Sequence, residues 1–166
     1  IKIQGLGGTG RHLCHLLLEQ GYMVQGYDIN PTCCTPFINH TGFTKLTSKN
    51  WFQSSCDIFA PCAQGDVINK QNVDQLNTSI ICGCANNPVH QDAHISLKKQ
   101  NILFIPDYIS NGGGLIYAAM HYNHSSQSEI NLQIQKIALR LDQLDLKQDL
   151  DLQAQKIIEE RLLAHA

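Results

Sequence analysis

Short apolar segments alternate with more polar connections through the first two thirds of the chain. The segments are four to seven residues long and apolar on both faces, as in strands of a parallel sheet that lies between two helical layers. They cover residues 1–5, 23–28, 43–46, 56–62, 79–85 and 102–106. This pattern predicts an α/β fold with a doubly wound, mostly parallel, six-stranded sheet. The connection over residues 31–42 contains two prolines and predicts only a short or distorted helix.

From about residue 112 the pattern becomes that of amphipathic helices. Isoleucine and leucine recur every three or four residues between Ile130 and Leu144, and Ser126 with Glu129 predicts a capping box at the start of this helix. A last helix is predicted over residues 152–164, with Ile157, Ile158 and Leu162 on one side. We therefore expect a sheet-containing domain core over residues 1–124 and C-terminal helices over residues 125–166.

Four glycines follow the first predicted strand, and Gly5, Gly7 and Gly10 fit the motif G-x-G-x-x-G. In this motif the first glycine permits a tight turn, the second lets the backbone approach a pyrophosphate, and the third lets the helix pack close to the sheet. A helix that begins near Gly8 directs its positive end at such a phosphate, and Leu13, Leu16 and Leu17 are predicted to lie on one face of it. The motif therefore indicates a dinucleotide-binding fold of the Rossmann type. The alternative is a glycine turn without a ligand.

Asp28 ends the second predicted strand, 18 residues after Gly10. A carboxylate at this place can accept hydrogen bonds from the adenosine ribose hydroxyls and would repel a 2′-phosphate. No arginine follows directly, so NAD is preferred over NADP as the cofactor. Arg11, in the first turn of the predicted helix, is either a phosphate contact or a solvated side chain.

Charge and composition exclude several classes of partner. The chain has 12 basic and 14 acidic residues without a basic cluster, which argues against nucleic acid and anionic membranes. Its apolar runs are too short to span a bilayer. The seven cysteines are odd in number, and their spacing fits neither a disulfide framework nor a zinc site. We expect a cytoplasmic protein with reduced thiols and no metal.

Three stretches at predicted strand ends narrow the chemistry further. They are CDIFAPCA over residues 56–63, GCANNP over residues 83–88 and PDYISNGGG over residues 106–114. In order and spacing they resemble the cofactor domain of the amino-acid dehydrogenases that act on glutamate, leucine, phenylalanine and valine. The resemblance runs from Ile1 to about Ala119 and is nearest to the leucine dehydrogenases. It implies that residues 1–124 form the NAD-binding, C-terminal domain of such an enzyme.

The resemblance also assigns roles to individual residues. The segment from Gly5 to Arg11 would hold the pyrophosphate, Asp28 the ribose, and Asn87 and Asn111 the nicotinamide side. The implied cofactor contacts are Gly5, Leu6, Gly7, Gly8, Thr9, Gly10, Arg11, Asp28, Ile29, Cys62, Ala63, Asn87 and Asn111. Leu115 and Ala118 match positions that line the substrate pocket. Simpler roles stay open: the two asparagines as helix caps, Leu115 and Ala118 as general core, and Cys62 as an apolar filler.

The family oxidises an L-2-amino acid to a 2-oxo acid and ammonia, with NADH as the other product. It places the catalytic lysines and aspartate in an N-terminal domain, which would precede Ile1. We therefore expect no catalytic residue in these 166 residues, no turnover by them alone, and a homo-oligomer as the full-length protein. The resemblance favours leucine and other branched-chain substrates. Phenylalanine or glutamate as the substrate, or a non-catalytic NAD-sensing module, are the alternatives.

Overall fold

The computed structural model describes residues 1–146 and 148–164, without the side chains of residues 140, 151, 158 and 160–164. The predicted contributions of Ile158 and Leu162 to the last helix lie outside the described side chains. The chain forms two compact units, Ile1–Asp107 and Tyr108–Ala166. The predicted boundary between residues 124 and 125 concerns the extent of the cofactor domain and stays a prediction.

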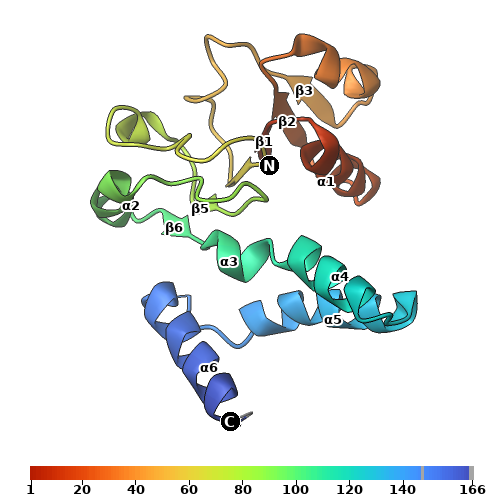
Figure 1. The fold of residues 1–166 in the computed structure, drawn as a ribbon. Helices are drawn as coiled ribbons and strands as arrows, with labels where there is room; N and C mark the ends of the chain where they lie inside the picture. Colours follow the sequence, from red (N-terminus) through yellow and green to blue (C-terminus); the bar gives the residue numbers. More distant parts are fainter. Residues whose placement is uncertain (147, 165–166) are drawn as a thin grey trace. The chain divides into compact units, whose positions relative to one another are not determined.

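All six predicted strands are present in one sheet, and every pair of neighbouring strands is parallel. The strands are β1 (Lys2–Gln4), β2 (Val24–Tyr27), β3 (Phe43–Lys45), β4 (Ile58–Pro61), β5 (Ile80–Ile81) and β6 (Leu103–Phe104). Their order is β3-β2-β1-β4-β5-β6, so β1 and β4 lie at the centre. Figure 1 labels β1, β2, β3, β5 and β6 of this sheet. This is the Rossmann strand order. Successive strands are added on one side of β1 up to β3 and then on its other side from β4 to β6, so the strand order reverses between β1 and β4. The predicted α/β fold is confirmed.

The helices of the first unit are α1 (Gly8–Glu19), α2 (His94–Lys99) and the 3₁₀ turns η1 (Pro31–Phe37), η2 (Val73–Gln75) and η3 (Gln91–Ala93). The connection after β2 is the expected short helix, a 3₁₀ segment with Pro36 inside it and Asn30 as its cap. On α1 the buried positions are Gly10, Cys14 and Leu18. Leu13 and Leu17 are half-buried but Leu16 is 52% exposed, so the prediction that the three share one face was wrong for Leu16. The close approach of Gly10 to the sheet fixes the rotation of the helix.

The apolar core covers both faces of the sheet. Phe59 and Ala60, neighbours on β4, belong to different buried clusters. One cluster contains residues of α1, β2 and η1, and the other contains residues of η2, η3 and α2. Side chains alternate along a strand, so a central strand contributes to both clusters. This burial on both faces is why the strands could be recognised as short apolar runs.

Lys2 is buried at the centre of this core, on β1. Its ammonium donates hydrogen bonds to the carbonyl oxygens of Phe52 and Ser54, both at 2.9 Å, and lies 4.9 Å from the ring centre of Phe59. Burial lowers the pKa of Lys2 below its usual range. These contacts anchor the connection between β3 and β4 to the sheet, so Lys2 has a structural role.

The second unit contains most of α3 (Asp107–Ser110) and the helices α4 (Gly113–Tyr122), α5 (Gln127–Leu141) and α6 (Leu150–Ala164). Gly113 faces Ile134 and Ile137 of α5. The predicted capping box is present, since Ser126 N donates to Glu129 Oε2 at 2.8 Å and Glu129 N donates to Ser126 Oγ at 3.4 Å. The predicted helix over residues 152–164 is α6, which starts two residues earlier.

Candidate functional site

The glycine loop between β1 and α1 is shaped by two glycines that tolerate no side chain. Gly5 has φ +91°, and a Cβ there would lie 2.5 Å from Cβ of Ala63. A Cβ on Gly10 would overlap the carbonyl oxygen of Gly5. Gly7 and Gly8 differ, because a Cβ on either would meet nothing within 4 Å. Gly5 and Gly10 are thus needed for the turn itself, whereas Gly7 and Gly8 leave open space above the backbone.

The start of α1 provides hydrogen-bond donors beside this open space. Gly7 is the N-cap, and the first intrahelical bond runs from Arg11 N to the Gly7 carbonyl oxygen at 2.9 Å. The preceding amides of the first turn, at Gly8, Thr9 and Gly10, have no acceptor within an α-helix. No acidic side chain lies in the first turn. The geometry suits an anion such as a phosphate, so the loop fits the pyrophosphate of a dinucleotide.

Asp28 connects the end of β2 to the glycine loop. Its Oδ2 accepts a hydrogen bond from Leu6 N at 2.7 Å, and its Oδ1 accepts one from Asn30 N at 2.8 Å. Each carboxylate oxygen has a second lone pair, so the half-buried group can still accept a ribose hydroxyl. Beside it, the side chain of Ile29 is 91% exposed. Asp28 therefore holds the loop in place besides being the predicted ribose contact.

The end of β4 lies directly under the glycine loop. Cys62 N donates to the Gln4 carbonyl oxygen at 2.7 Å, which extends the pairing of β1 and β4. The Cβ of Cys62 lies 3.1 Å from the position of a Cβ on Gly10, and Ala63 is packed against Gly5. The structure thus brings Cys62 and Ala63 together with the loop, at the point where the strand order reverses.

The backbone of Asn87, in the connection after β5, makes two hydrogen bonds that fix its position. It has φ +45°, a conformation in which asparagine is among the more frequent non-glycine residues. Asn87 N donates to Asp107 Oδ2 at 2.9 Å, and its carbonyl oxygen accepts from Asp66 N at 2.8 Å. The following helix η3 is capped by His90, so Asn87 is not its cap. The side chain of Asn87 is exposed. Its backbone is fixed by the carboxylate of Asp107, a residue for which the sequence alone predicted no role.

Asn111, Leu115 and Ala118 belong to the second unit. Asn111 is half-buried and lies between α3 and α4 along the chain. The N-cap of α4 is Gly112, so Asn111 is not the cap of that helix. Leu115 is 77% exposed and Ala118 is also exposed, while no residue of α4 is buried. The alternative that Leu115 and Ala118 are general core is therefore wrong for this unit. Their place in a substrate pocket stays a prediction.

Three features that would indicate other kinds of site are absent from the described residues. Within residues 1–146 and 148–164, no three His, Cys, Asp or Glu side chains are grouped so that they could hold a metal ion. The structure has no disulfide among its seven cysteines, all of which are described. No helix in the described part of the chain is long and apolar enough to cross a membrane.

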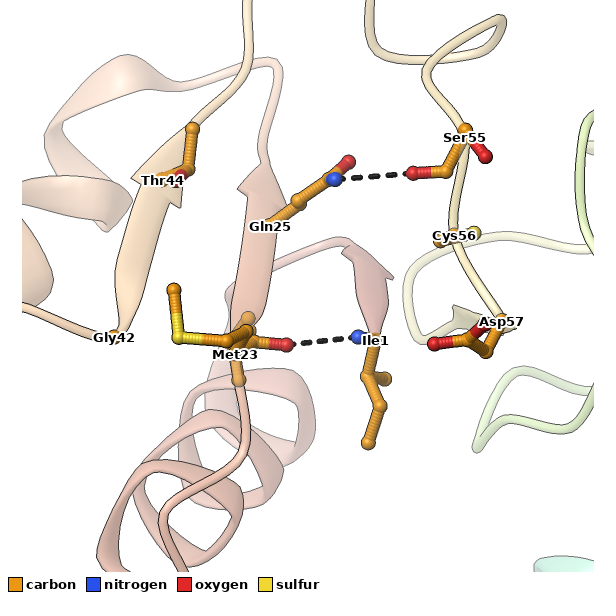
Figure 2. Close-up of a pocket in the computed structure, with 9 residues that line it drawn as sticks. Ile1, Met23, Gln25, Gly42, Thr44, Ser55, Cys56 and Asp57 are labelled. Atoms are coloured by element: carbon orange, nitrogen blue, oxygen red, sulfur yellow. Dashed lines mark hydrogen bonds between the residues drawn. The ribbon is translucent and has the colours of Figure 1, made fainter.

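A cavity of about 290 Å³ lies at the opposite edge of the sheet, where the strands begin (Figure 2). Its wall includes Met23 before β2, Thr44 on β3, and Asp57 before β4. Two hydrogen bonds connect residues of its wall. One runs from Ile1 N to the Met23 carbonyl oxygen and the other from Gln25 Nε2 to the Ser55 carbonyl oxygen. None of its lining residues is among the predicted cofactor contacts.

Comparison with known proteins agrees with the fold and with the family resemblance. Residues 17–145 match the family model of the Glutamate/Leucine/Phenylalanine/Valine dehydrogenases. The chain is 34% identical over 120 residues to a leucine dehydrogenase of Geobacillus stearothermophilus, covering 72% of this chain and 33% of that protein. It is 38% identical over 122 residues to a phenylalanine dehydrogenase of Thermoactinomyces intermedius, with the same shares covered.

The crystal structure of L-tryptophan dehydrogenase from Nostoc punctiforme superposes on this chain with a TM-score of 0.77. The sequence identity is 32%, and the match covers 82% of this chain and 42% of that chain. The present chain spans about a third of the length of the curated relatives that it matches. The chain belongs to the Glutamate/Leucine/Phenylalanine/Valine dehydrogenase family.

Proposed function

We propose that this chain is the NAD-binding, C-terminal part of an L-amino-acid dehydrogenase that deaminates leucine and related branched-chain amino acids. The observation that carries the proposal is the glycine loop, where Gly7 and Gly8 leave open space beside the first amides of α1. It lies at the reversal of strand order, where open α/β sheets bind nucleotides. Membership of the amino-acid dehydrogenase family narrows the chemistry.

The predicted contacts divide along the cofactor. The backbone from Gly5 to Arg11 would hold the pyrophosphate, with Leu6 N fixed by Asp28. Asp28 and Ile29 would contact the adenosine ribose, and the negative charge of Asp28 favours NAD over NADP. Cys62 and Ala63 would lie beside the cofactor, and Asn87 and Asn111 would contact its nicotinamide side.

When bound, NAD would accept the hydride from the α-carbon of the amino acid. The residues of this chain would orient the cofactor, and Leu115 and Ala118 would contact the substrate side chain. Proton transfer would fall to lysine and aspartate side chains outside these 166 residues, so the chain alone is expected to bind NAD without turnover. We propose a cytoplasmic homo-oligomer, with reduced thiols.

Phenylalanine is the second candidate substrate. The chain is 38% identical to a phenylalanine dehydrogenase and 34% identical to a leucine dehydrogenase, so identity does not favour leucine. Ala118 is small enough to leave room for an aromatic ring. Glutamate is a further alternative within the family, and an NAD-sensing module without catalysis is the alternative from another class.

A substrate screen of the intact protein tests the proposal. NADH absorbance would be followed with aliphatic, aromatic and acidic L-amino acids, each with NAD and with NADP. We expect the highest kcat/KM with leucine and NAD. A preference for phenylalanine would select the second candidate. Cofactor binding without turnover of any amino acid would favour the sensing module, and no binding of NAD would contradict all of these functions.

A further inference from the structure

Three cysteines lie at the ends of β4 and β5, where the glycine loop is also located. Cys62 follows β4, and Cys82 and Cys84 follow β5. All three are partly exposed, unlike Cys14 and Cys34, which are buried in the core. The chemistry of the proposed dehydrogenase needs no thiol.

The hydrogen bonds between the two strand ends place Cys84 beside Cys62. Cys82 N donates to the Phe59 carbonyl oxygen at 3.0 Å, and Cys84 N donates to the Pro61 carbonyl oxygen at 2.9 Å. In a parallel ladder these bonds set Cys84 opposite Cys62, which continues the pairing of Phe59 with Ile81. Neighbouring strands are about 4.8 Å apart, which lies within the Cα separations of roughly 4.4–6.8 Å found in disulfides.

The two thiols also interact directly. A hydrogen bond from Cys62 lowers the pKa of Cys84 to about 7. The same hydrogen bond, together with burial, raises the pKa of Cys62. The hydrogen bond thus favours a thiolate on Cys84 and a protonated thiol on the adjacent Cys62. This is the arrangement that a dithiol needs for oxidation by a peroxide.

Cys62 connects this pair to the glycine loop. Its Cβ lies 3.1 Å from the position of a Cβ on Gly10, so the Cys62 side chain packs directly under the start of α1. A disulfide has an S–S distance of about 2.05 Å, much shorter than a hydrogen bond between thiols. Forming it would draw the Cys62 side chain towards Cys84 and change its packing against Gly10. The packing of Cys62 under the glycine loop would then change.

We propose that Cys62 and Cys84 are a redox-responsive dithiol that forms a disulfide with hydrogen peroxide and thereby weakens dinucleotide binding at the glycine loop. The Cys84 thiolate attacks one peroxide oxygen, and the O–O bond breaks to give Cys84 sulfenic acid and hydroxide. The Cys62 thiol then attacks that sulfur and releases water, so two thiols are oxidised and one peroxide is reduced to water. The effect on binding rests on the proposed function, whereas disulfide formation does not.

The experiment treats the intact protein with hydrogen peroxide, alkylates the remaining thiols, and maps disulfide-linked peptides by mass spectrometry. NADH affinity is measured by fluorescence titration before and after oxidation, and again after reduction with dithiothreitol. We expect a peptide that links Cys62 with Cys84 and a Kd for NADH that rises roughly tenfold and recovers on reduction. Cys84→Ser keeps a hydroxyl beside Cys62, so its reduced form should bind NADH normally and be insensitive to peroxide. Cys82→Ser is the matched control and should still respond.

Two results would overturn the proposal: no link between Cys62 and Cys84 after oxidation, or an unchanged peroxide effect in Cys84→Ser. A reduced protein that fails to bind NADH would contradict the proposed function instead. In that case the disulfide-linked peptide still tests whether Cys62 and Cys84 form a disulfide. Its presence supports the dithiol pair, and its absence refutes it.

Discussion

The two edges of the sheet differ in what they offer a ligand. The edge where the strands begin has a cavity of about 290 Å³, lined by residues such as Met23 and Asp57. The edge where the strands end has the glycine loop, with open space above Gly7 and the first amides of α1 beside it. A hollow supplies volume, whereas directed amides supply recognition of a charged group. We therefore place the proposed cofactor site at the hydrogen-bond donors of the glycine loop and not at the edge with the measurable cavity.

The difference follows from the direction of the chain. In a parallel sheet every strand ends at the same edge, so the helices that follow begin there and direct their positive ends to it. Asp28 and Cys62 reach this edge because each directly follows a strand, and Asn87 lies in the connection that follows β5. Substitutions of matched residues at the two edges can therefore separate the ligand site from the rest of the fold.

The largest effect is expected for Gly10→Ala. The new Cβ would collide with the carbonyl oxygen of Gly5, a backbone atom that cannot rotate away. We expect a loss of about 3 kcal/mol in the free energy of unfolding and loss of NADH binding, measured by thermal denaturation and fluorescence titration. Gly42→Ala is the control at the other edge, where the nearest atoms would be 3.3 Å away. Equal effects of both substitutions would contradict the assignment of the site.

A smaller effect is expected for Asp28→Ala. It removes the acceptor of two backbone hydrogen bonds and the charge that would repel a 2′-phosphate. We expect Kd for NADH to rise roughly tenfold, with a smaller change for NADPH, so that the preference between them narrows. Asp57→Ala, in the wall of the opposite cavity, should change neither value. An unchanged cofactor preference in Asp28→Ala would mean that the ribose lies elsewhere.

A third effect concerns the reactivity of Cys84 with pH, and it leaves folding and cofactor preference untouched. Its pKa of about 7 means that the thiolate forms as the pH rises through neutrality, so alkylation by iodoacetamide should accelerate between pH 6 and pH 8, roughly tenfold. Cys62→Ala removes the hydrogen bond that lowers this pKa and should move the acceleration to higher pH. Cys56, at the opposite edge, is the control, and its rate of alkylation should be the same with and without this substitution. An unchanged Cys84 profile would contradict the direct contact of the two thiols.

Local sequence signals predicted the strands and the glycine loop because each is encoded by neighbouring residues. The strands are buried on both faces and so are apolar throughout, and Gly5, Gly7 and Gly10 are close in sequence. The network around the loop could not be predicted in this way. The bonds from Leu6 to Asp28 and from Asn87 to Asp107 join residues 22 and 20 positions apart. The pairing of Cys62 with Cys84 likewise depends on strand register, which the sequence pattern does not determine.

Leu16 illustrates the same limit within a helix. The sequence placed it on one face with Leu13 and Leu17, but it is 52% exposed while those two are half-buried. The contact of Gly10 with Gly5 sets the rotation of α1 and places Cys14 and Leu18 inside. A tertiary contact near one end thus decides which side of the whole helix is buried.

Gly7→Ala tests the central claim most directly, because it separates ligand binding from folding. The new Cβ would meet no protein atom within 4 Å and would enter the space assigned to the pyrophosphate. Gly114→Ala is the control, at a glycine of α4 with equally open surroundings. We predict that both variants keep the free energy of unfolding within about 1 kcal/mol, while only Gly7→Ala raises Kd for NADH, by roughly tenfold or more. Unchanged NADH affinity in a folded Gly7→Ala variant would contradict a dinucleotide site at this loop.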